Sequence, residues 1–398
     1  MEKVRFGIIG VGNMGSGHFR SFINNKVENG ICTAVADIDA SKLENIKKIA
    51  IEQNPDAAQL VNYYNSGDEL IEAKTCDVVI IAVPHYDHPV FAIKGLKNGY
   101  HVIVEKPAGV YTLQVEEMIE ESKKHPELKL GIMFNQRTNP LFKKMKQLIS
   151  DGELGEIRRL NWIITDWYRA QRYYDSGGWR ATWLGEGGGV LYNQAPHNLD
   201  LFQWIPDMMP SKVRAFCQFG KWHDIEVEDD VTAYFEYPNG ATGIFITTTG
   251  DAPGSNRFEI TGDKGRLVYD KGTLIFDKLE TPISEHTKTS ENGFAMPNRE
   301  RIEIKVEEDN PQHVGILNNF ANAVLGLEEL YAKAEEGIKG VTLANAMHLS
   351  TWTNDTVEIP FDGKKFYELL QEKIRNSTQE KKQVDTANSV DLSSTFNN

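Results

Sequence analysis

Two residues far apart in the chain carry side chains that can transfer a proton, Lys106 and His197. Lys106 lies in the stretch Val102-Ile103-Val104-Glu105-Lys106-Pro107, where an apolar β-branched run predicts a buried strand. The following proline disfavours the α conformation, so Lys106 is held extended at the strand end. Histidine titrates near neutrality, whereas a lysine needs desolvation or a nearby positive charge to lower its pKa. The two residue types predict acid–base chemistry.

Each of these residues also has a purely structural interpretation. Lys106 could be a solvated lysine at the end of a surface strand, and His197 could be a core histidine bonded to Asp200 one turn later. A continuous helix would put Asn193 and His197 on one face. Pro196 is tolerated only in a first turn or at a kink, so Asn193 could instead be the N-cap.

A glycine-rich turn near the start of the chain predicts a phosphate site. The predicted strand 4–9 runs into Gly10-Val11-Gly12-Asn13-Met14-Gly15 and then into a helix, which is G-x-G-x-x-G in its required context. Gly10 permits the tight turn, Gly12 lets the backbone approach a pyrophosphate, and Gly15 lets helix and strand pack closely. The helix start at Asn13 and Met14 offers free N–H groups to phosphates.

An acid ends the next predicted strand, residues 33–36, at Asp37, with Ile38 after it. A carboxylate there accepts hydrogen bonds from both ribose hydroxyls of an adenosine and repels a 2′-phosphate. Asp37 therefore favours NAD over NADP. The alternative is that Asp37 is the N-cap of the helix near Ser41.

Further strand ends carry polar side chains. Pro84 and His85 follow the predicted strand 77–83, and Glu105 and Lys106 end the strand 100–105. Strands alternate with helices at 90–96 and 112–123, which predicts a doubly wound parallel sheet, a Rossmann domain over residues 1–134. Because ligands bind outside the carboxyl ends of such strands, these side chains should line one cofactor crevice.

The pattern changes to an α+β domain over residues 135–363. Predicted strands with few helices between them indicate a large, mostly antiparallel sheet, and Tyr237-Pro238-Asn239-Gly240 is typical of a hairpin turn. An open sheet face needs cover, which predicts a homodimer or homotetramer through that sheet. Helices at 316–325 and 343–352 should pack back on the first domain or cover the sheet. Residues 282–299 are predicted as a polar loop insertion, and residues 364–398 as a polar tail.

Two aromatic-rich stretches contain the candidate substrate residues. Asp166-Trp167-Tyr168-Arg169 and the segment 173–180 combine paired donors and acceptors with flat apolar surfaces, as polyol recognition requires. They favour a glycoside or pyranose over a small hydroxy acid. The alternative is that these aromatic residues only pack in the core.

Composition narrows the function classes. The 398 residues carry a net charge of −14, which argues against a nucleic-acid partner. No stretch approaches the ~20 apolar residues of a membrane span. The three cysteines show no metal-ligand spacing and fit a reducing compartment, so we expect a cytoplasmic protein without a metal site.

Taken together, the motifs resemble the Gfo/Idh/MocA family of sugar and cyclitol oxidoreductases. The resemblance rests on the glycine turn, Pro84 with His88, Glu105-Lys106-Pro107, Asn135-x-Arg137-x-x-Pro140, Gly152-Glu153-Leu154-Gly155-Glu156-Ile157 and His197-x-x-Asp200. It implies a Rossmann domain with an open-sheet substrate domain, NAD(P) dependence, and dimers or tetramers. It also implies that Lys106 contacts the reacting hydroxyl and that His197 exchanges the substrate proton. The cofactor residues then include Pro84, His85, His88, Trp179 and Arg180, and the substrate residues Asn135, Asp166, Tyr168, Arg169 and Asn193.

Asn193 departs from the family pattern, because many members carry an aspartate there and an amide cannot take a proton at neutral pH. Three functions compete: an NAD-dependent dehydrogenase of a sugar, glycoside or cyclitol; a glycosidase that retains NAD and oxidises its substrate transiently; and a non-catalytic sensor. Lys106 and His197 argue against the sensor, which needs neither.

Overall fold

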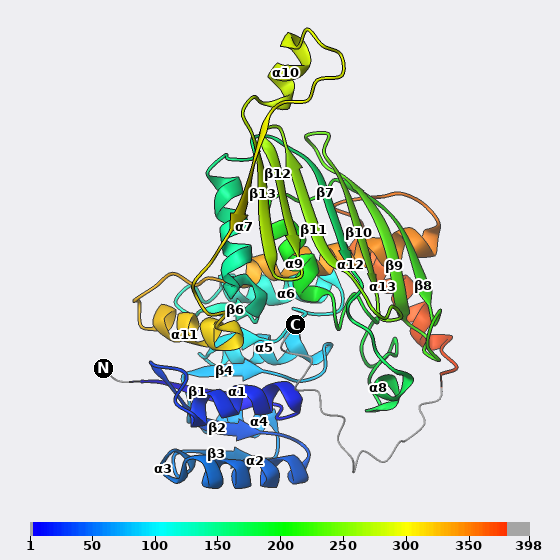
Figure 1. Cartoon of the computed structure of the whole chain (residues 1–398). Coiled ribbons are helices and arrows are strands. Elements are labelled where there is room, and N and C mark those ends of the chain that lie inside the picture. The colour runs from blue at the N-terminus through cyan, green and yellow to red at the C-terminus, as the bar shows by residue number, and fades with distance from the viewer. Residues whose placement is uncertain (1–2, 380–398) are drawn as a thin grey trace.

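A parallel six-stranded sheet organises the first part of the chain in this computed structural model, which describes residues 3–379 (Figure 1). The strand order is β3-β2-β1-β4-β5-β6, as in a Rossmann domain. The strands are β1 (Val4–Ile9), β2 (Gly30–Ala36), β3 (Asn62–Tyr64), β4 (Val78–Ile81), β5 (His101–Val104) and β6 (Leu130–Ile132). The predicted fold class is confirmed. The short, partly polar edge strand β3 was not predicted, because three residues give no periodic signal.

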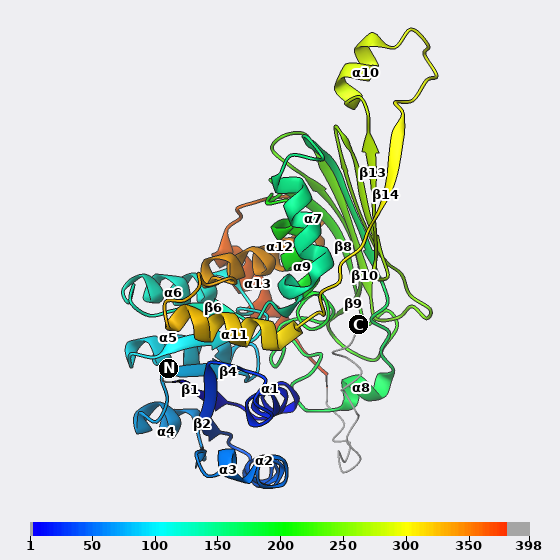
Figure 2. The ribbon, with the colours of Figure 1, turned by 60° about the vertical axis from the view of Figure 1, so that its left-hand side comes forward.

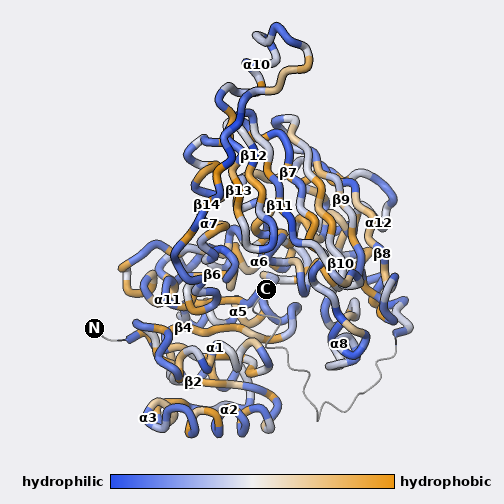
Figure 3. The backbone as a smooth tube through the Cα atoms, in the orientation of Figure 1, coloured by the Kyte–Doolittle hydropathy of each residue, from blue (hydrophilic) through white to orange (hydrophobic). Residues whose placement is uncertain are grey.

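Helices cover both faces of this sheet, so its central strands are apolar throughout. Ile8, Ile80 and Ile103 are fully buried. The helices are α1 (Asn13–Ile23), α2 (Ala40–Gln53), α3 (Pro55–Ala58), α4 (Gly67–Ala73), α5 (Asp87–Lys97) and α6 (Thr112–Lys123). Figure 3 shows the contrast between the apolar central strands and the polar outer turns of α2.

A second, nine-stranded sheet follows, with the order β14-β13-β12-β11-β7-β10-β9-β8-β15. Its neighbours are antiparallel except for the parallel pair β7–β10, and the predicted turn at residues 237–240 joins β9 to β10. The strands are β7 (Ile157–Ile164), β8 (Lys212–Phe219), β9 (Glu228–Glu236), β10 (Thr242–Thr248), β11 (Asn256–Gly262), β12 (Gly265–Asp270), β13 (Thr273–Leu279), β14 (Arg299–Ile304) and β15 (Val357–Glu358).

One face of the larger sheet is covered by α7 (Pro140–Ser150), α9 (Pro196–Trp204) and α12 (Ala334–Thr353) (Figure 2). Side chains alternate accordingly along β9, where Ala233 and Phe235 are buried and Tyr234 is 42% exposed. Phe216 and Ile244 on neighbouring strands are exposed as well. Association of copies through this open face stays a prediction.

The late helices join the two domains. α11 (Gln312–Val324) packs on the first domain, where Ile316, Leu317 and Phe320 belong to the same core as β1, β4 and β5. α12 contacts α6 of the first domain as well as α9 and β8 of the second. The predicted insertion contains α10 (Ile283–Thr289), which stands at the far end of the β13–β14 hairpin (Figure 1). No helix within residues 3–379 has the length and apolar character to cross a membrane.

The prediction of a polar tail from residue 364 is wrong for its first part, where α13 (Gly363–Arg375) forms. Asp362 caps this helix by accepting a hydrogen bond from the Lys364 N–H at 2.9 Å. Phe366 and Leu370 lie one turn apart and are fully buried. Many charged residues surround these two apolar ones, so the overall composition of the segment does not indicate a packed helix. Residues 380–398 of the predicted tail lie outside the described residues.

Replacing Phe366 with Ala should lower the free energy of unfolding by about 3–5 kcal/mol, because Phe366 is fully buried and stacks on Trp352 at 5.3 Å. Urea denaturation followed by circular dichroism measures this loss. The matched control Glu368→Ala, on the exposed side of α13, should change stability by less than about 0.5 kcal/mol. Equal effects of the two variants would contradict the packing of α13.

Candidate active site

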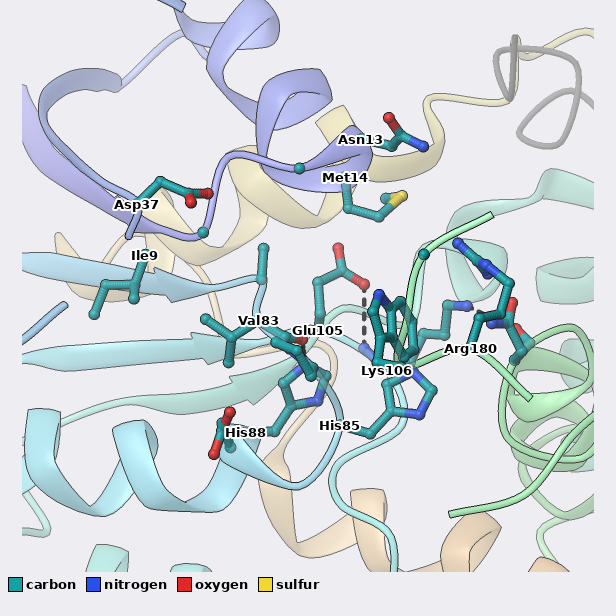
Figure 4. A pocket seen from close by; sticks show the side chains of 18 of the residues that line it. Ile9, Asn13, Met14, Asp37, Val83, His85, His88, Glu105, Lys106 and Arg180 are labelled. Atoms are coloured by element: carbon teal, nitrogen blue, oxygen red, sulfur yellow. Dashed lines mark hydrogen bonds between the residues drawn. The ribbon is translucent and has the colours of Figure 1, made fainter. Parts of the chain in front are cut away.

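A cleft of about 1020 Å³ lies between the carboxyl edge of the six-stranded sheet and loops of the second domain. Most of the predicted site residues line it: Gly10, Gly12, Asn13, Met14, Asp37, Ile38, Pro84, His85, His88, Glu105, Lys106, Asn135, Arg169, Trp179, Arg180, Asn193 and His197. Figure 4 shows Asp37 at one end of this cleft and Lys106 and Arg180 toward the other.

Three predicted residues do not line the cleft. Gly15 packs helix α1 on the turn, since an added Cβ would meet the Gly10 carbonyl oxygen at 1.9 Å. The predicted substrate residues Asp166 and Tyr168 are not among the residues that line the cleft. They alternate with Trp167 and Arg169, which do line the cleft. Successive side chains of an extended segment point to opposite sides, so only every second residue of this stretch reaches the site.

The glycine turn fits a dinucleotide. Gly10 has a φ of +88°, which favours glycine, and an added Cβ on Gly12 would meet nothing within 4 Å, so the backbone is open to the cleft. Asp37 Oδ2 accepts a hydrogen bond from the Val11 N–H at 2.8 Å, which fixes the acid beside the turn. Asp37 is not the N-cap of α2. That role belongs to Asp39, which accepts from the Ser41 N–H at 2.9 Å.

Two buried histidines brace the middle of the cleft. The ring nitrogens of His88 lie 2.7 Å from the Pro107 carbonyl oxygen and 2.8 Å from that of Val83, tying two strand ends together. His85 Nδ1 lies 3.2 Å from the Glu186 carbonyl oxygen, and its ring meets Trp179 edge-on at 5.5 Å. Burial lowers the pKa of both histidines.

Glu105 and Lys106 are held by different partners. Burial alone would raise the pKa of the Glu105 carboxyl, but the hydrogen bond and charge of His18, at 2.6 Å, bring it down to about 2. Lys106 Nζ donates to the Asn193 carbonyl oxygen at 2.9 Å. Burial lowers the pKa of Lys106, while the carboxyl groups of Glu105 and Glu186 oppose this shift. The solvated-lysine interpretation is therefore wrong.

His197 is the second residue of α9, which begins at Pro196 after the N-cap Ala195. Asn193 precedes the helix, so both predictions for it, a shared helix face and an N-cap, are wrong. Proline is preferred at the first helical position, which explains the late start. His197 Nδ1 is buried without a hydrogen-bond partner in the described part of the chain. Burial, and then the charges of Lys106 and His313, lower the pKa of His197.

Asp200 does not bond His197, which overturns the core-histidine interpretation in that form. Its two carboxylate oxygens accept hydrogen bonds from the Arg137 guanidinium at 2.6 and 2.7 Å. Arg137 is fully buried and also pairs with Glu336 of α12. On α9, therefore, His197 lines the cleft while Asp200 pairs with Arg137. The His197-x-x-Asp200 spacing does not indicate a contact between these two side chains.

Sequence reasoning missed a network behind the cleft. Glu186 is 1% exposed, and its carboxylate accepts hydrogen bonds from the Asn193 side-chain amide and, at 2.6 Å, from the Ala181 N–H. Tyr173 donates its hydroxyl to Asn193 Oδ1 at 3.0 Å. Burial raises the pKa of Glu186. In the sequence, the one feature that could have selected Glu186 is its position directly before the glycine run 187–189.

His313 also lines the cleft, from the N-terminal end of α11. Its ring lies 5.5 Å from that of His18, and burial lowers its pKa to about 4. No recognisable motif surrounds His313, so sequence analysis alone does not select it. Within residues 3–379, no group of three or more His, Cys, Asp or Glu side chains could hold a metal ion.

Comparison with known families accounts for both domains. Residues 4–131 match an oxidoreductase family with an NAD-binding Rossmann fold, and residues 142–268 match the GFO/IDH/MocA C-terminal domain. The chain is 26% identical over 272 residues to myo-inositol 2-dehydrogenase of Thermotoga maritima, covering 66% of this chain and 74% of that enzyme. It is 27% identical over 202 residues to a glycosyl hydrolase family 109 protein of Shewanella pealeana, covering 48% of this chain and 42% of that protein.

The chain spans about half the length of several other curated relatives that it matches. Among solved structures, the WlbA dehydrogenase of Bordetella pertussis in complex with NADH and UDP-GlcNAcA shares the fold, with a TM-score of 0.74 at 22% sequence identity. That alignment covers 91% of this chain and all of the other. The chain therefore belongs to the Gfo/Idh/MocA family of NAD-binding oxidoreductases.

Proposed function

We propose that this protein transfers a hydride between NAD and a secondary alcohol of a sugar, glycoside or cyclitol. The observation that carries the proposal is that Lys106, Asn193 and His197 line the same cleft as the open glycine turn and Asp37. Oxidation of an alcohol needs a hydride acceptor at the carbon and a proton acceptor at its hydroxyl oxygen. The cofactor half and the acid–base half of the cleft supply these two requirements.

The charges around Lys106 and His197 support different roles for them. Burial lowers the pKa of Lys106, and two carboxyl groups, Glu105 and Glu186, oppose this shift and favour its cationic form. The positive charge of Lys106 in turn disfavours a proton on His197. Lys106 is then the cation that binds and polarises the substrate oxygen, and neutral His197 accepts the hydroxyl proton. Bound NAD supplies the hydride acceptor, while the chain holds the alcohol carbon against it.

Asn193 orients Lys106 without titrating. Its main-chain carbonyl oxygen accepts a hydrogen bond from Lys106 Nζ, and its side-chain amide donates to Glu186. We propose that Glu186, acting through Asn193, supplies the negative charge that other family members carry directly at this position. Glu186 is a positioning residue, since it does not line the cleft.

The proposed cofactor is NAD rather than NADP. Asp37 lines the cleft, and its carboxylate is fixed by the Val11 and Asp39 N–H groups at 2.8 and 2.9 Å. Lys42 Nζ lies 3.8 Å from Asp37 Oδ1 and partly offsets the negative charge of this carboxylate. A 2′-phosphate would meet a carboxylate that cannot turn away.

A glycosidase that retains NAD and oxidises its substrate transiently is the second candidate, favoured by the similarity to a glycosyl hydrolase family 109 protein. The same acid–base pair would serve it, since transient oxidation uses the same proton transfer. The two candidates differ in product. A dehydrogenase accumulates NADH, whereas the glycosidase cleaves its substrate with no net NADH.

The decisive experiment incubates the protein with NAD⁺ and a panel of pyranosides, free sugars and inositols, and follows NADH absorbance and products. We expect NADH to accumulate, and Lys106→Ala and His197→Ala each to lower kcat/KM by about 10²–10⁴-fold. In Lys106→Ala, which keeps His197, the loss of kcat/KM at acid pH should move to higher pH, because the lysine charge that disfavours a proton on His197 is removed. Variants within a few-fold of the parent would contradict the assignment.

Glu186→Gln should lower kcat/KM about 10-fold and move the loss of activity at high pH to lower pH. The reason is that a carboxylate favouring the Lys106 cation is removed. A pH–rate profile measures the shift. The control Glu226→Gln removes a carboxylate that bonds the Trp183 N–H at 2.8 Å, outside the cleft, and should leave the profile in place. A purely structural role for Glu186 would lower activity without moving the profile.

Asp37→Ser should lower the preference for NAD over NADP by about 100-fold, because a like-charge contact with the 2′-phosphate disappears. The ratio of kcat/KM values for the two cofactors measures this. Asp39→Asn, which keeps a good N-cap and does not line the cleft, should leave the ratio unchanged. A parent protein that already prefers NADP would contradict the proposal.

A further inference from the structure

Acidic and basic side chains divide the cleft into two halves. Asp37, Asp68 and Asp87 line the end formed by β2, α4 and α5, where the adenosine is proposed to bind. Lys106, Arg169, Arg172 and Arg180 line the other end, and the one acid that lines the cleft beside them is Glu105, whose carboxylate is bonded to His18. This half is cationic in a chain whose net charge is −14.

The cations of this half lack carboxylate partners. Asp37 has Lys42 within 3.8 Å, and Asp68 is paired with Lys94, so two of the three acids at the adenosine end lie beside basic residues that also line the cleft. By contrast, Lys106, Arg169, Arg172 and Arg180 form no ion pair within 4.0 Å in residues 3–379. Glu186 offsets part of this charge from behind the cleft wall. The site thus keeps an excess of positive charge.

Arg169 is the cation best prepared for a ligand. Its N–H donates to the Thr249 carbonyl at 3.0 Å, and its own carbonyl accepts from His223 Nε2 at 2.8 Å, so its backbone is fixed. The guanidinium lies 5.2 Å from the Tyr173 ring and 5.9 Å from the Trp167 ring. Nη1 donates to the Tyr168 carbonyl at 2.8 Å, while the buried Nε has no partner in the described part of the chain.

The neighbouring arginines serve other purposes. Arg180 Nη1 donates to the Tyr173 hydroxyl at 2.6 Å, and its guanidinium stacks on Tyr173 and Trp179, which leaves less of it for a ligand. Arg172 is exposed on the short helix α8 (Gln171–Asp175) at the rim. Arg169 therefore provides a partly buried guanidinium, and such groups bind anionic oxygens through charge-assisted hydrogen bonds.

We propose that the substrate is an acidic sugar, with its anionic group held by Arg169 while a hydroxyl of the same molecule reaches Lys106 and His197. This inference rests on the proposed function and narrows its substrate class. A carboxylate and a phosphate ester offer the same chemistry to Arg169. The ring of Trp167, which lines the cleft beside Arg169, offers apolar surface to the carbon skeleton of a sugar.

The test compares matched pairs that differ by the charged group: glucuronate with glucose, galacturonate with galactose, and glucose 6-phosphate with glucose. We expect kcat/KM for NAD⁺ reduction, and binding to the NADH-loaded protein by calorimetry, to favour one or more acids over the neutral sugar by at least about 10-fold. Preference for the uronates would identify a carboxylate, and preference for the sugar phosphate would identify a phosphate ester.

Arg169→Gln should weaken binding of the preferred acid by about 10–100-fold, leave its neutral counterpart within about two-fold, and leave the Kd for NADH unchanged. The control Arg20→Gln, on the exposed side of α1, should change none of these values. A higher Kd for NADH in Arg169→Gln would assign Arg169 to the cofactor and overturn the proposal.

Two further outcomes separate this inference from the proposed function. If the acids bind the NADH-loaded protein more tightly than neutral sugars but no sugar is oxidised, the acidic-ligand inference stands and the dehydrogenase assignment fails. If neutral sugars bind and react as well as the acids, the dehydrogenase assignment stands and the acidic-substrate inference is wrong.

Discussion

The geometry of the site depends on one buried ion pair, Arg137 with Asp200. Arg137 is fully buried, and a cation there would be strongly destabilising without its carboxylate partners. Asp200 accepts two of its N–H groups at 2.6 and 2.7 Å, and Glu336 of α12 accepts a third. The pair joins the 3₁₀ turn after β6, Asn135–Thr138, to α9 and α12. His197 lies one turn before Asp200 on the same helix. The Arg137–Asp200 pair therefore fixes the position of His197, although neither residue of the pair has a proposed role in the reaction.

A second constraint is the order of charges around Lys106. Glu105 is held anionic by His18, and Glu186 lies behind Asn193, so negative charge surrounds the lysine on the protein side. On the cleft side, the half-buried His197 and His313 have lowered pKa values, and neither adds a competing cation near neutrality. The proposed roles, oxygen polarisation by a charged lysine and proton acceptance by a neutral histidine, fit this arrangement. Each proposed role depends on the neighbours as well as on the residue type.

Local patterns predicted the cofactor half of the cleft well. The glycine turn, Asp37 and the strand ends at His85 and Lys106 lie where alternating strands and helices require them, since parallel strands share one carboxyl edge. The failures involve contacts over long sequence distances. Arg137 is 63 residues from Asp200, and the sequence gives no sign that it takes the carboxylate first assigned to His197. The polar composition of residues 364–375 concealed α13 because two buried residues sufficed to dock it.

The substrate half is assembled from segments that no single motif connects. Arg169 comes from the stretch after β7, His197 from α9 and His313 from α11, which packs back on the first domain. Gln312, beside His313, accepts a hydrogen bond from the Asn135 side chain and so couples the end of the Rossmann domain to this late helix. A change in these packing contacts can move the cleft-lining side chains of Arg169, His197 and His313. The glycine turn and Glu105-Lys106-Pro107 can stay in place during such a change. The fold can thereby retain one cofactor-binding edge while its loops and late helices vary the groups that face it.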